Sequence, residues 1–139
     1  MWDKDFSRFS YGFRPNKNAG MAVRQARAYI NSGYAHIVDI DLKSFFDKVN
    51  HDYLMSLLKR KIDDPPLLRL IWRYLRSPMQ VDGKLGKRRQ GVPQGGPLSP
   101  ILSNIVLDEL DRELENRGVR FVRYADDCAP GTRTAAILF

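Results

Sequence analysis

Residues 119–127 read Val119-Arg120-Phe121-Val122-Arg123-Tyr124-Ala125-Asp126-Asp127. The first seven residues are rich in β-branched and aromatic side chains, which is typical of a strand. Two adjacent carboxylates follow at the strand end. Because adjacent carboxylates repel each other, a cation or a basic partner is the simplest reason to place them together. The alternative is a plain turn, which is a common role of aspartate after a strand.

A second strand pattern covers residues 36–42, and Asp41 stands near its end. A carboxylate there is costly unless it is paired or binds a metal ion. If the two strands are neighbours in one sheet, Asp41, Asp126 and Asp127 meet at one point. Oxygen ligands of this kind suit Mg²⁺. Two such ions about 3.5–4 Å apart activate an attacking hydroxyl and stabilise a leaving pyrophosphate.

Helical periodicity covers much of the remaining chain. Apolar residues recur at helical spacing in four segments, which are residues 19–32, 51–62, 67–75 and 99–117. Asn50 and Ser99 are expected N-cap residues, and Gly33 and Gly118 are expected to end helices.

Two turn signals separate these segments. The Asp64-Pro65-Pro66 stretch is expected to end the helix over residues 51–62, before the next helix begins at Leu67. Residues 79–90 suggest a β-hairpin that turns at Asp82-Gly83. Helices that alternate with strands predict an α/β or α+β fold.

The composition restricts the class of protein. The chain has 139 residues, of which 43% are hydrophobic and 28% charged, as in a globular domain. A net charge of +7 favours polyanionic partners, of which nucleic acid is the commonest. No apolar run approaches the roughly 18 residues of a membrane helix, and the start does not read as a secretory signal. The single cysteine, Cys128, excludes an internal disulfide and fits a cytoplasmic location.

A glycine- and proline-rich loop covers residues 90–100, directly before the last helix, and its backbone is able to approach a ligand closely. Three other motifs accompany it: Tyr11-Gly12-Phe13-Arg14-Pro15-Asn16, Asp41-Leu42-Lys43-Ser44-Phe45-Phe46-Asp47 and Tyr124-Ala125-Asp126-Asp127. In this order and spacing, the four motifs make the chain resemble reverse transcriptases, most closely the group II intron-encoded branch (reverse transcriptase/maturase). The resemblance runs from about residue 6 to residue 127.

The resemblance implies an α+β fold, a right-hand polymerase palm with part of the fingers. An antiparallel sheet carries the acidic site in that fold, and helices flank it. The strands near residues 36–42 and 119–125 are expected to be adjacent. The implied division is fingers-like at about 1–35 and 65–95, palm at about 36–64 and 96–127, and a divergent tail at 128–139.

The resemblance also implies a metal site and a nucleotide site. Asp41, Asp126 and Asp127 match the metal-binding carboxylates, and Leu42 matches the residue whose backbone carbonyl completes a metal shell. Phe46 matches the aromatic residue that lies against the sugar 2′-carbon and so favours deoxynucleotides.

Further residues match the surroundings of the nucleotide. Gln94 and Gly95 match the loop that lines the incoming nucleotide and the template base, and Arg14 is a candidate for contacting template or triphosphate. The densest basic cluster consists of Lys84, Lys87, Arg88 and Arg89. It is either a solvated hairpin or a surface that neutralises phosphates of a template–primer duplex.

The implied activity is RNA-directed DNA polymerisation. Its implied cofactors are two Mg²⁺ ions, with Mn²⁺ as a substitute. Its implied partners are an RNA template, a DNA primer and deoxynucleoside triphosphates, with intron RNA as a further candidate and no membrane. The subclass of intron and the oligomeric state stay open.

The chain departs from the family pattern at both ends. After Asp127 the family continues with a hydrophobic strand, whereas Pro130 and Gly131 are expected to interrupt any ladder here. No thumb or N-terminal fingers motif is found, so truncation, or a reading-frame change just past Asp127, is expected. A catalytically inactive remnant that binds intron RNA is therefore one alternative. A retron or diversity-generating reverse transcriptase is another, although residues 11–15 and 94–100 favour the group II branch.

Overall fold

The computed structural model describes residues 2–34, 36, 38, 40–41, 45–81, 84–93, 95–125 and 127–131, with the backbone alone at 40–41, 79–81, 84–85 and 127–131. The chain forms two compact units, residues 1–43 with 107–139, and residues 44–106. The second boundary falls inside helix α5 (Ser99–Asn116), so no linker in the sequence marks it. These bounds differ from the expected fingers and palm segments, whose assignment stays a prediction.

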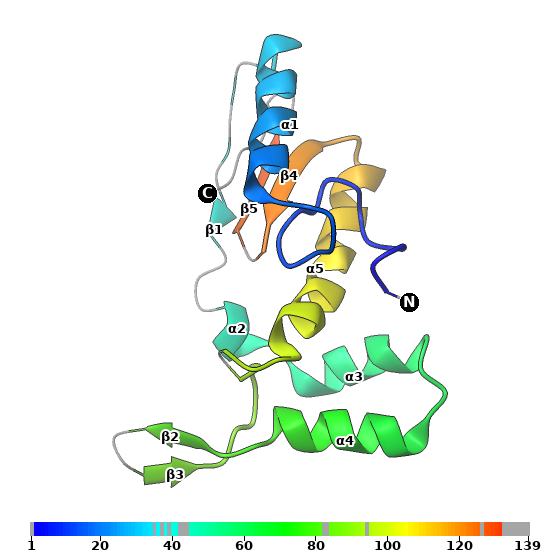
Figure 1. Cartoon of the computed structure of the whole chain (residues 1–139), viewed down its shortest axis with the longest axis vertical. Helices are drawn as coiled ribbons and strands as arrows, with labels where there is room; N and C mark the ends of the chain where they lie inside the picture. The colour runs from blue at the N-terminus through cyan, green and yellow to red at the C-terminus, as the bar shows by residue number, and fades with distance from the viewer. Residues whose placement is uncertain are drawn as a thin grey trace. The chain divides into compact units, whose positions relative to one another are not determined.

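The first unit contains a three-stranded antiparallel sheet (Figure 1). Its strands are β1 (Ile40–Asp41), β4 (Arg120–Tyr124) and β5 (Asp127–Gly131). The order is β1-β5-β4, so the expectation that β1 and β4 are adjacent is wrong. β5 lies between them, because it turns back directly after β4 and offers its second edge to β1. β1 is also shorter than the expected strand over residues 36–42.

The expected interruption of the ladder at Pro130 and Gly131 is wrong as well. Pro130 lies opposite Phe121, and Gly131 lies opposite Arg120. In an antiparallel pair, only alternate residues bond to the facing strand. Arg123 directs its N–H to the Phe9 carbonyl (2.9 Å) and its carbonyl to the Tyr11 N–H (2.8 Å), so it bonds away from β5. Phe121 lies two residues before Arg123, so its backbone groups also point away from β5. The ladder between β4 and β5 therefore requires no N–H from Pro130, the residue opposite Phe121.

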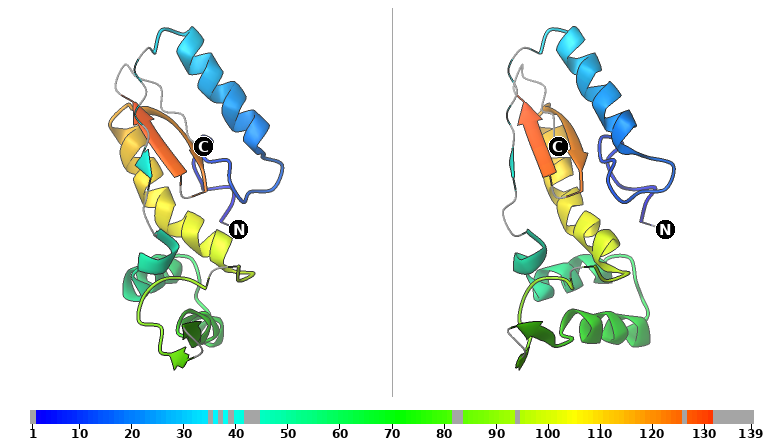
Figure 2. Two further views of the ribbon diagram at one scale, coloured as in Figure 1. Left: turned by 90° about the vertical axis from the view of Figure 1, so that its left-hand side faces the viewer. Right: turned by 60° about the vertical axis from the view of Figure 1, so that its left-hand side comes forward.

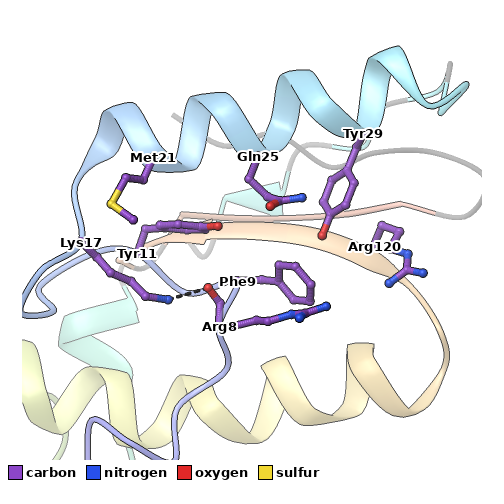
Figure 3. A pocket seen from close by; sticks show the side chains of 8 residues that line it. All are labelled: Arg8, Phe9, Tyr11, Lys17, Met21, Gln25, Tyr29 and Arg120. Atoms are coloured by element: carbon purple, nitrogen blue, oxygen red, sulfur yellow. Dashed lines mark hydrogen bonds between the residues drawn. The ribbon is translucent and has the colours of Figure 1, made fainter.

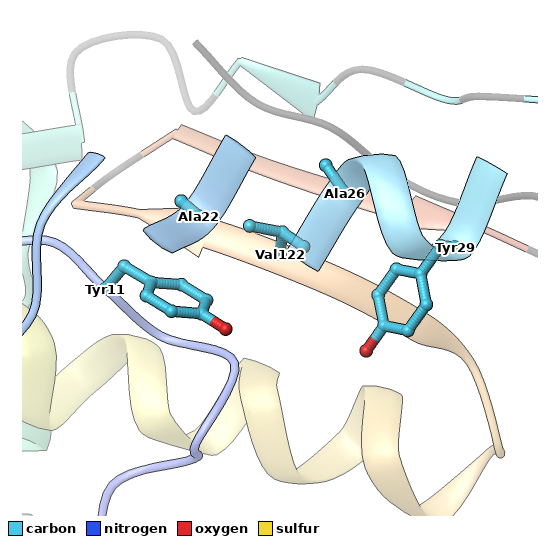
Figure 4. Packing of buried hydrophobic residues seen from close by; sticks show 5 residues of the cluster. All are labelled: Tyr11, Ala22, Ala26, Tyr29 and Val122. Carbon is cyan, nitrogen blue, oxygen red and sulfur yellow. The ribbon is translucent and has the colours of Figure 1, made fainter. Parts of the chain in front are cut away.

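Two helices cover opposite faces of β4 (Figure 2). Val122 packs with Ala22 and Ala26 of α1 (Ala19–Asn31), as Figure 4 shows. The neighbouring Phe121 packs with Leu114 of α5. This division follows from the strand geometry, because successive side chains of a strand point to opposite faces.

Glycine ends both of these helices. Gly33 has a φ of +92° and Gly118 a φ of +68°, the left-handed conformation that other residues rarely adopt. After α5, the Val119 N–H donates to the Leu114 carbonyl at 2.9 Å and the Gly118 N–H to the Glu115 carbonyl at 2.9 Å. This is a Schellman arrangement. The predicted ends of both helices are confirmed.

The second unit contains helices α2 (Phe45–Lys48), α3 (His51–Lys59) and α4 (Pro65–Leu75) and the hairpin of β2 (Met79–Val81) and β3 (Lys84–Gly86). The predicted cap Asn50 is confirmed, since its side chain accepts the Tyr53 N–H at 2.9 Å. α4 begins at Pro65 rather than Leu67. Asp64 caps it, and prolines suit a first turn because no hydrogen bond is required of their nitrogens there.

The α+β prediction is confirmed by these helices and antiparallel strands. Within the described segments, no helix is both long enough and apolar enough to span a bilayer.

Candidate active site

The sheet of the first unit brings two of the predicted acidic positions together. Asp41 on β1 lies directly opposite Asp127 on β5, and Tyr124 on β4 lies opposite Asp127 from the other side. Directly opposed residues of antiparallel strands have Cα atoms about 4.5–5.5 Å apart. Asp126 and Leu42 fall outside the described residues. Their roles, and the separation of the carboxyl groups, stay predictions.

The acidic turn is the chain reversal at Ala125, between the end of β4 at Tyr124 and the start of β5 at Asp127. Ala125 has a φ of +63° and is 8% exposed. The left-handed conformation costs a residue with a Cβ roughly 1–2 kcal/mol. Such a conformation persists only where the surroundings hold it. The neighbours of Ala125 therefore determine where the acidic turn lies.

Arg123 is one of these neighbours, and its side chain is fully buried. Its Nη1 donates to the Ala125 carbonyl at 2.6 Å. Its Nε and Nη2 donate to the two carboxylate oxygens of Asp111 on α5, at 2.8 and 2.7 Å. Nη2 also donates to Ser10 Oγ at 2.7 Å. One guanidinium therefore joins the N-terminal segment, α5 and the acidic turn.

The partner of Arg123 is buried to the same extent, since the side chains of Asp111 and Arg123 are both 0% exposed. Burial raises the pKa of the Asp111 carboxyl, and the hydrogen bonds and charge of Arg123 oppose this rise. The sequence pattern alone did not reveal this pair. A signal was present, because Arg123 falls on the same strand face as the apolar Phe121, and a charge on a buried face needs a partner.

Gly12 holds the other side of the turn. A Cβ at this position would overlap the backbone nitrogen of Ala125 and lie 2.8 Å from its Cα. The segment that carries Gly12 is fixed to β4 through the two hydrogen bonds between residues 9–11 and Arg123, and Ser10 forms a parallel bridge with Arg123. The motif at residues 11–16 therefore lies beside the motif at residues 124–127, which their separation in sequence did not reveal.

Arg14 belongs to the same segment, and its side chain stabilises the fold of that segment through hydrogen bonds. Its Nε donates to Asp3 Oδ1 at 2.7 Å, and its two Nη atoms donate to the carbonyls of Asp3, Ser7 and Ser10 at 2.5–3.0 Å. Four of its five N–H groups are thus occupied. A contact between Arg14 and template or triphosphate stays a prediction.

The second unit holds the predicted nucleotide loop, and backbone bonds fix the start of that loop. The Gly91 N–H donates to the Val49 carbonyl at 2.7 Å, and the Val92 N–H donates to the Phe46 carbonyl at 2.6 Å. Gly91 has a φ of +83°, and a Cβ on it would lie 2.7 Å from the Asp47 carbonyl oxygen. Two predicted site elements, Phe46 and the glycine-rich loop, are therefore neighbours. Gln94 falls outside the described residues, and Gly95 is exposed.

The basic cluster lies next to this loop. Lys87 and Arg89 are exposed, whereas Arg88 is half-buried and donates from Nη1 to the Val92 carbonyl at 3.1 Å. For Lys84, on β3, only the backbone is described. Phosphate binding by the cluster stays a prediction. No group of three or more metal-binding side chains is present among the side chains that the structure describes.

Comparison with known proteins assigns the chain to a class. Residues 1–136 match the family described as reverse transcriptase (RNA-dependent DNA polymerase). Protein YkfC of Escherichia coli (strain K12) is 36% identical over 121 residues, which are 84% of this chain and 32% of that protein. Group II intron-encoded protein LtrA of Lactococcus lactis subsp. cremoris is 32% identical over 123 residues, 88% of this chain and 20% of that protein. A chain of the solved partial Cas6-RT-Cas1–Cas2 complex is 29% identical, with a TM-score of 0.49 over 88% of this chain and 22% of that chain.

The chain therefore belongs to the reverse transcriptase family, and its relatives include a group II intron-encoded protein. The resemblance inferred from the four motifs is confirmed. The chain spans 32% and 20% of the length of the two relatives.

Proposed function

We propose that this chain is the part of a group II intron-type reverse transcriptase that adds deoxynucleotides to a primer 3′-hydroxyl under the direction of an RNA template. The observation that carries the proposal is the register of the sheet, which pairs Asp41 with Asp127 beside the turn that Arg123 and Gly12 hold. Family membership supports the same activity.

The donor set fits Mg²⁺, which prefers carboxylate and carbonyl oxygens and takes its remaining ligands from water and phosphates. Asp41, Asp126 and Asp127, with the Leu42 carbonyl, would hold it. When bound, Mg²⁺ supplies activation of the primer hydroxyl and charge stabilisation on the departing pyrophosphate. Mn²⁺ accepts the same oxygen ligands. The chain itself supplies the placement of the carboxylates, because Arg123 and Gly12 hold the turn from two sides.

The second unit supplies nucleotide selection in this proposal. The ring of Phe46 excludes a 2′-hydroxyl and so favours deoxynucleotides, and Gln94 and Gly95 line the nucleotide. The Val92–Phe46 hydrogen bond couples the loop to the backbone that carries the ring. Lys84, Lys87, Arg88 and Arg89 neutralise template–primer phosphates. The RNA template, the primer and intron RNA are the proposed partners, in the cytoplasm.

Primer extension tests the proposal directly. The full chain is incubated with poly(rA)/oligo(dT), dTTP and Mg²⁺, and extension is expected. Asp41→Asn, Asp126→Asn and Asp127→Asn should each reduce the rate by on the order of 10³-fold or more, because each removes a charge needed in the transition state.

Asp63→Asn is the matched control, because Asp63 is an exposed aspartate in the loop between α3 and α4. This variant should extend the primer at the rate of the unsubstituted chain. If a folded, unsubstituted chain gives no extension with Mg²⁺ or Mn²⁺, or if the three variants match Asp63→Asn, the proposal is wrong.

A further inference from the structure

A cavity of about 400 Å³ lies in the first unit, among the N-terminal segment, α1 and β4 (Figure 3). Its walls carry three cations and three aromatic rings, which belong to Arg8, Lys17, Arg120, Phe9, Tyr11 and Tyr29. No carboxylate is found among the described residues that line it. Its volume lies within the range of pockets that hold small ligands.

The positive charge of the cavity is not balanced within the described part of the chain. Neither Arg8 nor Arg120 forms an ion pair there: Arg8 lies 4.7 Å from the centre of the Phe9 ring, and Arg120 Nε donates to the Tyr34 hydroxyl at 3.4 Å. Two carboxylates, Asp3 and Asp111, act on Lys17 through their charges. Both are already paired with other arginines, Arg14 and Arg123.

Lys17 forms one end of the cavity. Its Nζ donates to the carbonyls of Arg8 and Ser10, the latter at 3.0 Å, and lies 4.7 Å from the centre of the Tyr11 ring. Burial lowers the pKa of Lys17 to about 8. Lys17 therefore fixes the wall of the cavity, whereas the two guanidinium groups of Arg8 and Arg120 keep donors available.

Tyr29 supplies a third donor. The residue is 8% exposed, and the Gln25 side chain acts on its hydroxyl, but no described residue meets hydrogen-bond geometry with that hydroxyl. Burial raises the pKa of Tyr29 to about 12, although the charges of Arg120 and Arg8 oppose this rise. The hydroxyl thus keeps its proton at neutral pH. A buried hydroxyl without a partner is costly unless a ligand accepts from it.

We propose that this cavity binds a phosphate group, with the Tyr29 hydroxyl and the guanidinium groups of Arg8 and Arg120 as its donors. Guanidinium groups have donors and no acceptors, and they form strong, charge-assisted bonds with phosphate oxygens. A water molecule satisfies the Tyr29 hydroxyl but does not neutralise the positive charge of Arg8 and Arg120. The remaining volume accommodates the sugar attached to a phosphate, so the phosphate belongs either to a nucleic-acid strand or to a free nucleotide. The site does not depend on polymerase activity, because it uses none of the acidic residues.

Binding of a labelled twelve-nucleotide single-stranded RNA to the full chain tests the proposal. The double variant Arg8→Gln/Arg120→Gln should weaken binding about tenfold. It should also reduce the slope of log affinity against log salt concentration by the amount expected for about one phosphate contact. The matched control is Arg24→Gln/Arg27→Gln, which removes the same charge from exposed positions of α1 and should change binding less than about threefold. Equal effects of the two double variants would overturn the proposal.

Tyr29→Phe separates ligand binding from folding. It keeps the ring, so the unliganded variant should melt at the temperature of the unsubstituted chain or above it, yet bind RNA about threefold or more weakly. Unchanged RNA affinity would contradict the role of the hydroxyl. Asp63→Asn should leave RNA affinity unchanged, and primer extension by the unsubstituted chain, measured separately, distinguishes failure here from failure of the proposed polymerase.

Titration with inorganic phosphate and with AMP identifies the source of the phosphate. Competition with RNA at this site by either small ligand, absent in Arg8→Gln/Arg120→Gln, supports a free phosphate group. If RNA binding depends on Arg8 and Arg120 but neither small ligand competes with it, the ligand of the cavity is a phosphodiester of a nucleic-acid strand. If no phosphate compound binds in a way that depends on Arg8 and Arg120, the proposal is wrong.

Discussion

Arg123→Met is expected to lower the free energy of unfolding by about 3–5 kcal/mol, because it leaves the Asp111 carboxylate buried without its charge partner. The guanidinium makes hydrogen bonds to Asp111, Ser10 and Ala125, and methionine replaces none of them. Urea denaturation followed by circular dichroism measures the loss. A large part of it should return in Arg123→Met/Asp111→Leu, which removes the stranded carboxylate.

Arg117→Met, at the position directly after α5, is the matched control. Arg117 pairs with Glu113 at 2.6 Å, but both side chains are more than half exposed, so the change should cost less than about 1 kcal/mol. If Arg123→Met costs no more than Arg117→Met, the buried pair does not stabilise the fold as argued.

The pH dependence gives a second readout of the same pair. Burial raises the pKa of Asp111 and Arg123 opposes the rise, so removing Arg123 should raise this pKa further. The folded variant then binds the Asp111 proton at pH values where the unfolded chain has lost it. Its stability therefore falls as pH rises through that pKa. The deficit of Arg123→Met relative to the unsubstituted chain should shrink on acidification, and a deficit that grows would contradict this assignment.

Local features of the fold could be predicted from the sequence because they depend on neighbouring residues alone. Asn50 caps α3, and Gly33 and Gly118 end helices, because the hydrogen bonds and φ angles involved lie within a few residues. The prolines at 65 and 66 were misread for a related reason. A proline pair is able either to end a helix or to start one; here α3 already ends at Lys59, and Asp64 caps the helix that begins at Pro65.

The order of the sheet could not be predicted in this way. Whether Pro130 interrupts a ladder depends on which alternate residues of β4 bond to β5, and this is fixed by the turn at Ala125 and by the segment that bonds to Arg123. Asp41 and Asp127 are opposed in the sheet, but they meet through β5 and not through the expected pairing of β1 with β4. The residues that hold them, Arg123 and Gly12, act through contacts that are distant in sequence.

Gly12→Ala is expected to destabilise the first unit by about 3 kcal/mol, because the added Cβ overlaps the backbone of Ala125 rather than a movable side chain. Gly118→Ala is the matched control. Its added Cβ contacts no other atom within 4 Å. The variant therefore loses stability only because a residue with a Cβ adopts a φ of +68°, which costs about 1–2 kcal/mol. Thermal unfolding compares the two variants. A loss in Gly12→Ala equal to or below that in Gly118→Ala would show that the loop yields without cost.

Amide hydrogen exchange locates the damage in Gly12→Ala. The Tyr11 N–H donates to the Arg123 carbonyl and the Arg123 N–H donates to the Phe9 carbonyl, so both bonds lie beside the overlap. Their exchange should accelerate in Gly12→Ala, because a shift of the segment opens them without global unfolding. In Gly118→Ala it should change only as far as global stability changes. Primer extension should fall in Gly12→Ala as well, since a shift of Ala125 displaces the start of β5, where Asp127 lies. Full extension together with accelerated exchange would show that this displacement does not affect the chemistry.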